Sequence, residues 1–237
     1  MRKELYEQYL KNTPNGEVDV SSENLYLIGV NGINETERRR KIIWAGKILK
    51  ILTFERAYHI CSSDKQFEEM MQLQNSPLHL EPIYVDGKTF IGYKLRSTIH
   101  EDDDWISDVI ENKNDPNVEI DLKNKTIILK NSSKRKEIFL RDCCFLCENI
   151  FFARGKGIDI DENILNIFRK VQPNKRGIDI PAIFGRRKDG KVNSLRGWLT
   201  IEECAEAKKL IEIVTKKAKS IHQRESLKEN ISHQGKC

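Results

Sequence analysis

Residues 25–58 are the segment around which the predicted fold is organised. It reads Leu25-Tyr-Leu-Ile-Gly-Val-Asn-Gly32, then Arg38-Arg39-Arg40-Lys41, then Ile42-Ile-Trp-Ala-Gly-Lys-Ile-Leu49, and finally Thr53-Phe-Glu-Arg-Ala-Tyr58. Both apolar runs contain β-branched and aromatic residues, which favours strands over helices at this length. Asn31-Gly32 is a turn signal. The stretch therefore predicts a strand, a basic loop, a second strand and a helix capped by Thr53.

Composition limits the class of protein. The chain has 237 residues, of which 38% are hydrophobic and 32% charged, which suits a soluble globular protein of one domain with an extension. No apolar run approaches the roughly 20 residues of a membrane helix, and the first ten residues lack a signal-peptide core. We therefore expect a cytoplasmic protein with no membrane partner, no metal, no cofactor and no disulfides among its six cysteines.

Charge is unevenly distributed along the chain. Residues 134–237 contain 23 Lys and Arg against 14 Asp and Glu, whereas the whole chain has a net charge of only +5. A basic half can supply the phosphate attraction that nucleic-acid binding needs, and it can equally be a solvated surface.

Working outward from the opening stretch, the pattern predicts further short elements. They are helices over 3–11, 63–73, 105–111 and 163–171, hairpins over 83–93 and 118–129, a strand over 136–142 and a helix from Thr200 to about Lys219. The apolar run from Cys143 to Ala153 is expected to be buried. Strands interleaved with short helices predict an α+β fold around a small, strongly bent or barrel-like mixed sheet, with peripheral helices and a C-terminal helix.

The predicted organisation has four parts. Residues 1–24 form an N-terminal helix and linker, 25–171 the α+β domain, 172–222 a basic loop region and C-terminal helix packed on that domain, and 223–237 a disordered tail.

The densest group of acid–base residues is His100, Asp102, Asp104 and Asp108 with their acidic neighbours. Such a run can ligate Mg²⁺ or orient a water molecule, and it can instead cap a helix and face solvent. Asp115, Glu119, Asp121 and Lys123 likewise fit either a metal-dependent nuclease or an ordinary hairpin. Cys143, Cys144 and Cys147 fit buried thiols better than a zinc site, because vicinal cysteines are poorly placed for tetrahedral ligation.

Three blocks of sequence resemble the nucleotide-modification-associated domain proteins of phage and bacterial base-modification gene clusters. They are Tyr26-Leu-Ile-Gly29 with Lys41 to Phe54, Ser76-Pro-Leu-His79 with the later His100 and Trp105, and Phe139-Leu-Arg-Asp142 through Gly157. The likeness covers about residues 25 to 170. Residues 1–24 contain no obvious counterpart of the family's first strand.

The resemblance implies a PUA-like fold that reads modified or flipped bases in nucleic acid, linked to DNA modification or defence. Such readers hold an extruded base between aromatic faces. The aromatic candidates are Trp44, Tyr93, Trp105 and Phe152, each of which could instead pack in the core, and His79 joins them. Arg154 and Lys156, in a glycine-rich loop, and Arg186 and Arg187 are candidates for phosphate contacts.

Two other functions stay open. One is a hydrolase acting on modified DNA, either a base-excising glycosylase or a metal-dependent nuclease, with His100, Asp102, Asp104 and Asp108 as its catalytic group. The other is a protein-interaction factor that uses the helix from Thr200. The sequence does not decide between DNA and RNA, nor does it give the oligomeric state.

Overall fold

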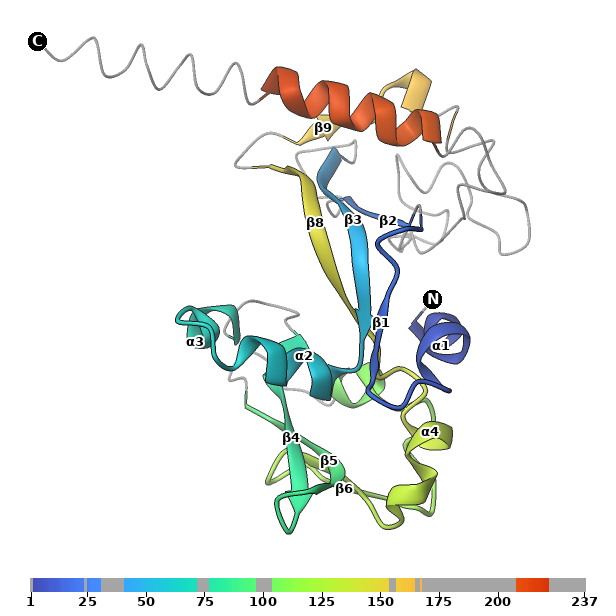
Figure 1. Cartoon of the computed structure of the whole chain (residues 1–237), viewed down its shortest axis with the longest axis vertical. Coiled ribbons are helices and arrows are strands. Elements are labelled where there is room, and N and C mark those ends of the chain that lie inside the picture. Colours follow the sequence, from blue (N-terminus) through green and yellow to red (C-terminus); the bar gives the residue numbers. More distant parts are fainter. Residues whose placement is uncertain are drawn as a thin grey trace, which may run out of the picture. The chain divides into compact units, whose positions relative to one another are not determined.

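The computed structural model describes residues 2–23, 25–30, 41–71, 77–96, 104–153, 157–164, 167 and 208–221. Helices and strands are mixed along this part of the chain (Figure 1). The chain divides into two compact units, each discontinuous in sequence: unit 1 comprises 1–20 and 50–146, and unit 2 comprises 21–49 and 147–237. The α+β class is confirmed.

The first sheet is organised around one long strand, β3 (Lys41–Leu52). Its partners are β1 (Glu17–Asp19), β2 (Tyr26–Val30), β8 (Cys144–Phe152) and β9 (Ile158–Asp159). β2 is antiparallel to the first part of β3, with Tyr26 opposite Lys47, and β1 is antiparallel to its end, with Glu17 opposite Leu52. In Figure 1 the yellow β8 runs beside the light-blue β3. The opening stretch therefore forms the predicted strand pair, and a further strand lies in the segment predicted as a linker.

The second sheet belongs to unit 1 and has the strand order β4-β5-β7-β6. Its strands are β4 (Leu80–Val85), β5 (Thr89–Leu95), β6 (Val118–Asp121) and β7 (Thr126–Leu129), all antiparallel to their neighbours. Asp86 and Gly87, between β4 and β5, both have positive φ, at 53° and 66°. This conformation is the one that the Asp-Gly signal predicts. Because β6 and β7 also pair antiparallel, with Asp121 opposite Thr126, both predicted hairpins are confirmed.

Several short helices complete unit 1. They are α1 (Arg2–Leu5) continued by the π-helical turn η1 (Tyr6–Leu10), α2 (Phe54–Cys61), α3 (Phe67–Met71), the 3₁₀ turns η2 (Pro77–His79), η3 (Asp104–Asp108) and η4 (Ser132–Lys134), and α4 (Arg135–Ile138). Thr53 caps α2 as predicted, because its Oγ1 accepts a hydrogen bond from the backbone N–H of Arg56 at 3.2 Å.

Each unit has its own hydrophobic core. In unit 1 the α2 and α3 residues Phe54, Phe67 and Met71 pack with the second sheet and with η3. In unit 2 Ile42 and Ala45 of β3 and Phe151 of β8 pack against Leu210, Val214 and Ala218. These last three residues lie on a helix over 208–221 and are spaced by four positions, which places them on one face. These three residues are buried, and the described part of the predicted C-terminal helix is thus confirmed.

Three expectations need correction. The strands of the described residues form two antiparallel sheets rather than one barrel-like mixed sheet. Residues 136–142, predicted as a strand, contain most of α4, and the side chain of Asn131 caps the turn that leads into it. The run 143–153 is only partly buried: β8 carries Leu146 and Phe152 as exposed residues, because a strand with solvent on one face buries only some of its side chains.

None of the helices in the described part of the chain combines the length and the apolarity that crossing a bilayer requires.

An ion-pair cluster joins β1 to β3 and α2 in unit 1, and its contribution to stability should depend on pH. Glu17 accepts hydrogen bonds from Lys50 Nζ and, at 2.7 Å, from Arg56 Nε. These hydrogen bonds, the one from Lys50 having the larger effect, lower the pKa of Glu17 below its ordinary value of 4.5. A lowered pKa in the folded state stabilises the protein above the pKa of the unfolded chain and loses this effect as pH falls through the folded-state pKa.

We therefore expect Glu17→Gln to lower the free energy of unfolding by about 1 kcal/mol at pH 7. The difference from the unmodified protein should shrink as pH falls through the lowered folded-state pKa of Glu17 and should be lost once the carboxyl is protonated in both states. Urea unfolding of the two proteins at pH 7 and pH 3 measures this. An equal difference at both pH values would contradict the role of the Glu17 charge.

Candidate functional site

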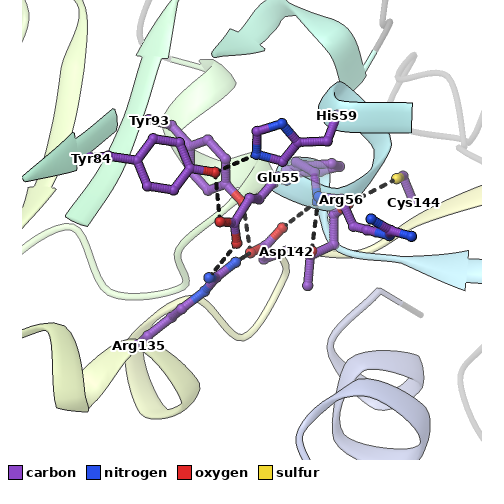
Figure 2. Close-up of polar contacts among 10 residues, drawn as sticks. Glu55, Arg56, His59, Tyr84, Tyr93, Arg135, Asp142 and Cys144 are labelled. Carbon is purple, nitrogen blue, oxygen red and sulfur yellow. Dashed lines mark hydrogen bonds and ion pairs between the residues drawn. The ribbon is translucent and has the colours of Figure 1, made fainter. Parts of the chain in front are cut away.

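A chain of polar side chains runs through unit 1 and involves α2, β4, β5, α4 and Asp142, which lies two residues before β8 (Figure 2). At its buried end Asp142 is fully inaccessible. Its Oδ1 accepts the backbone N–H of Phe54 at 2.7 Å, and its Oδ2 accepts Tyr93 Oη–H at 2.8 Å and Arg135 Nη2 at 3.2 Å. Asp142 therefore holds the N-terminus of α2 through a charge-assisted bond.

Glu55 continues the chain toward the surface. Its Oε2 accepts Arg135 Nη1 at 2.5 Å and its Oε1 accepts Tyr84 Oη–H at 2.7 Å. The Nε2 of His59 lies 2.5 Å from the same Tyr84 oxygen. Because the Tyr84 hydrogen points to Glu55, the His59 Nε2 must carry the proton of the His59–Tyr84 bond.

The pKa shifts follow from burial and from the charges in this chain. Burial raises the pKa of Asp142 above its ordinary value, while Arg135 acts in the opposite direction. Burial and then the Asp142 charge raise the pKa of Tyr93 well above 10. Burial alone would lower the pKa of Arg135, but Tyr93, Asp142 and Glu55 together raise it. Tyr93 and Arg135 therefore stay protonated as donors at neutral pH.

The arrangement is suited to holding structure rather than to reaction. Every carboxylate oxygen of Asp142 and Glu55 already accepts a hydrogen bond from within unit 1. The Arg135 guanidinium also stacks on the Phe90 ring, 3.8 Å from its centroid. A general base must lie within hydrogen-bond reach of a substrate, and Asp142 is fully buried. We infer that this network positions α2 against the second sheet.

The aromatic candidates divide between core and surface. Tyr93 and Trp105 are 0% and 4% exposed and lie in the core of unit 1, so neither can stack on a base without local rearrangement. His79 is buried as well. Phe152, at the end of β8, is 58% exposed, and Trp44 is half-buried.

The charged candidates are largely beyond the described residues. His100, Asp102, Arg154, Lys156, Arg186 and Arg187 lie outside them, as does the side chain of Asp104. Asp108 is paired with Arg2, whose Nη1 donates to its Oδ1 at 2.7 Å. Among the described residues no group of three or more His, Cys, Asp or Glu side chains could hold a metal ion. The hydrolase alternative stays a prediction.

The cysteine candidates are thiols in the described region. Cys143 and Cys144 are buried, and burial raises the pKa of Cys143 to about 12 and that of Cys144 well above 9. Cys147 is half-buried, and burial raises its pKa to about 11. Thiols with raised pKa values are poor nucleophiles, so these residues are not suited to covalent catalysis.

A second candidate surface lies on unit 2. Trp44 extends from β3 and donates Nε1–H to Asn149 Oδ1 of β8 at 2.8 Å. Its neighbour Ala45 is in the unit 2 core, and successive strand residues point to opposite faces, so Trp44 lies on the face away from that core.

Sequence reasoning missed the polar network, and it missed that unit 2 places Trp44 beside Asn149. Arg135, Glu55 and Asp142 are separated by up to 87 positions in the printed sequence, and no local spacing joins them. The one available signal was Arg141-Asp142, a charged pair directly before the apolar run of β8.

Comparisons with protein-family models, with curated proteins and with solved structures find no significant match to this chain.

Proposed function

We propose that this protein binds nucleic acid and that the contact surface lies on unit 2. The observation that carries the proposal is how charge divides between the sequence segments that make up the two units. Unit 2 contains 24 Lys and Arg against 15 Asp and Glu, whereas unit 1 contains 17 against 21. The net charges are therefore +9 and −4, and a polyanion would be drawn to unit 2.

The helix over 208–221 supports this proposal. It contains five lysines and one glutamate. Its apolar residues pack inward, and Lys217 pairs with Asp161 at 2.5 Å. The remaining lysines, which are Lys208, Lys209, Lys216 and Lys219, are exposed. A row of exposed lysines suits contacts with a phosphate backbone, which carry no sequence information.

The ends of the first sheet provide further support. Ala153 N–H donates to Ile43 O at 2.9 Å, so the end of β8 lies beside the start of β3. In the sequence, Arg38 to Arg40 directly precede β3, and Arg154 and Lys156 follow the end of β8. The resemblance to the nucleotide-modification-associated family makes DNA with modified bases the first ligand to test.

Replacing the four exposed helix lysines with glutamine should weaken binding of labelled DNA by roughly tenfold or more at moderate salt. The logarithmic salt slope should fall by about one for each lysine that contacts a phosphate. Fluorescence anisotropy of the full chain over a salt series measures both quantities.

The matched control removes the same charge from unit 1. It replaces Lys65, Lys88, Lys123 and Lys130, which are exposed as well, with glutamine. This variant should bind DNA nearly as the unmodified protein does. An equal loss in both variants would show that net charge alone matters and would contradict a contact surface on unit 2. Absence of binding in the unmodified protein would end the proposal.

Base recognition is tested with paired duplexes that differ only by 5-hydroxymethylcytosine in place of cytosine. Tighter binding of the modified duplex would support a reader of modified bases. Equal affinity would contradict recognition of that modification and would leave the phosphate-driven binding intact.

A further inference from the structure

Trp44 is placed unlike the other described tryptophan. Trp105 is a member of the unit 1 core, whereas Trp44 belongs to neither of the two core clusters of the described residues. It is half-buried on the sheet face opposite Ala45. Trp44 therefore lies outside the core, although its strand β3 contributes Ile42 and Ala45 to the core of unit 2. Its position requires an explanation.

Two glycines make room for the ring. A Cβ added at Gly46 would lie 2.7 Å from Trp44 Cζ2 and 2.9 Å from Trp44 Cη2, which is closer than non-bonded carbon atoms approach in proteins. The six-membered ring therefore occupies the space that a side chain at position 46 would fill. Gly29 pairs with Trp44 on the neighbouring strand β2. A Cβ added at Gly29 would lie 3.4 Å from Trp44 Cβ, an ordinary van der Waals contact.

The ring is also fixed at its polar edge. The 2.8 Å bond from Nε1 to Asn149 joins Trp44 to the neighbouring strand β8. The N–H of a tryptophan needs one acceptor, and Asn149 supplies it, so a ligand need only contact the ring itself. A ring that is held before binding loses little side-chain entropy when a ligand stacks on it.

We infer that Trp44 is a stacking platform for an unpaired base, so that the preferred ligand of unit 2 is single-stranded nucleic acid. This inference rests on the proposed function. In a duplex the base faces are covered by their neighbours, whereas in a single strand every base has a π-face that can stack on an aromatic ring.

The charge of unit 2 and an exposed aromatic side chain on β8 support a nucleic acid as the occupant. The unit carries a net charge of +9, which complements a polyanion. Phe152, at the end of the neighbouring strand β8, is 58% exposed. Positive charge together with exposed rings on sheet strands is the combination that single-strand binding surfaces use.

The test measures anisotropy of a labelled 12-nucleotide oligothymidine and of a 12-base-pair duplex with the full chain. Trp44→Ala should bind the oligothymidine about 10-fold more weakly, the size of effect expected for one lost base–aromatic stack. Its affinity for the duplex should change less than twofold. Leu122→Ala, which removes an exposed apolar side chain from unit 1, is the control and should change neither affinity.

A second variant keeps the test decisive if Trp44→Ala does not fold. In the unmodified protein, oligothymidine should quench tryptophan emission, and in Trp44→Phe most of this quenching should be lost, although Trp105 and Trp198 remain. Equal quenching in both proteins would contradict the platform.

The outcomes separate this inference from the proposed function. If Trp44→Ala folds and binds oligothymidine as tightly as the unmodified protein does, while the helix-lysine variant binds weakly, the platform is wrong and nucleic-acid binding stands. If the unmodified protein binds neither strand nor duplex, both are wrong. Duplex affinity above single-strand affinity would overturn the single-strand preference.

Discussion

Asp142→Ala is expected to lower the free energy of unfolding by about 3–5 kcal/mol, the cost of removing one partner from a buried ion pair. The carboxylate is fully buried, and three donors converge on it: Arg135, Tyr93 and the N–H of Phe54. Without it, a buried hydroxyl and the first N–H of α2 lose their acceptor, and Arg135 keeps only its bond to Glu55. Urea unfolding followed by circular dichroism measures the change.

A double-mutant cycle isolates the pair. Arg135→Met alone should also destabilise the protein, because it leaves Asp142 charged and buried. The double variant Asp142→Ala with Arg135→Met should cost clearly less than the sum of the two single changes, since both charges leave together. Additive costs would mean that the Arg135–Asp142 contact contributes no coupling, and would contradict its role in the network.

The sequence was informative where structure is determined locally. The Thr53 cap depends on a side chain and an N–H three residues apart, and the turn between β4 and β5 depends on Asp86 and Gly87 alone. Such signals are complete within a few residues. They correctly predicted α2 and the first hairpin.

The sequence was less informative where contacts between distant residues determine local structure. Residues 136–142 have the composition of a strand, yet Arg135 and Asp142 enclose a helical turn whose ion pairs reach Glu55 of α2. The acidic residues before Trp105 gave no indication that the indole itself is buried in the unit 1 core. Side-chain direction depends on tertiary packing there, and composition does not determine it.

The candidate site illustrates the same limit. Charge asymmetry was visible in the sequence, but the assignment of the positive charge to one compact unit required the fold, because that unit is assembled from residues 21–49 and 147–237. Trp44 was a candidate from its residue type. Its position over Gly46 and beside Asn149 depends on the register of β3 with β8, which a single sequence does not specify.

Gly92→Ala is expected to destabilise unit 1 by about 3 kcal/mol or more, in the upper range for a side chain forced into a packed site. Gly92 lies in β5, a central strand that pairs with both β4 and β7. A Cβ at this position would lie 1.9 Å from Ile127 O and 2.9 Å from Ile127 C. Both atoms are backbone of the neighbouring strand, so relief requires the strands to separate and the ladder to break.

Gly87→Ala is the matched control for this substitution. Gly87 has a φ of +66°, but nothing lies within 4 Å of an added Cβ, so only the backbone conformation is strained. That strain should cost about 1–2 kcal/mol. Urea unfolding of both variants, followed by circular dichroism and tryptophan fluorescence, compares the two costs. Because a clash with backbone cannot be relieved by rotating a side chain, Gly92→Ala must be the more damaging change. Equal stabilities would show that β5 and β7 are not packed at this spacing.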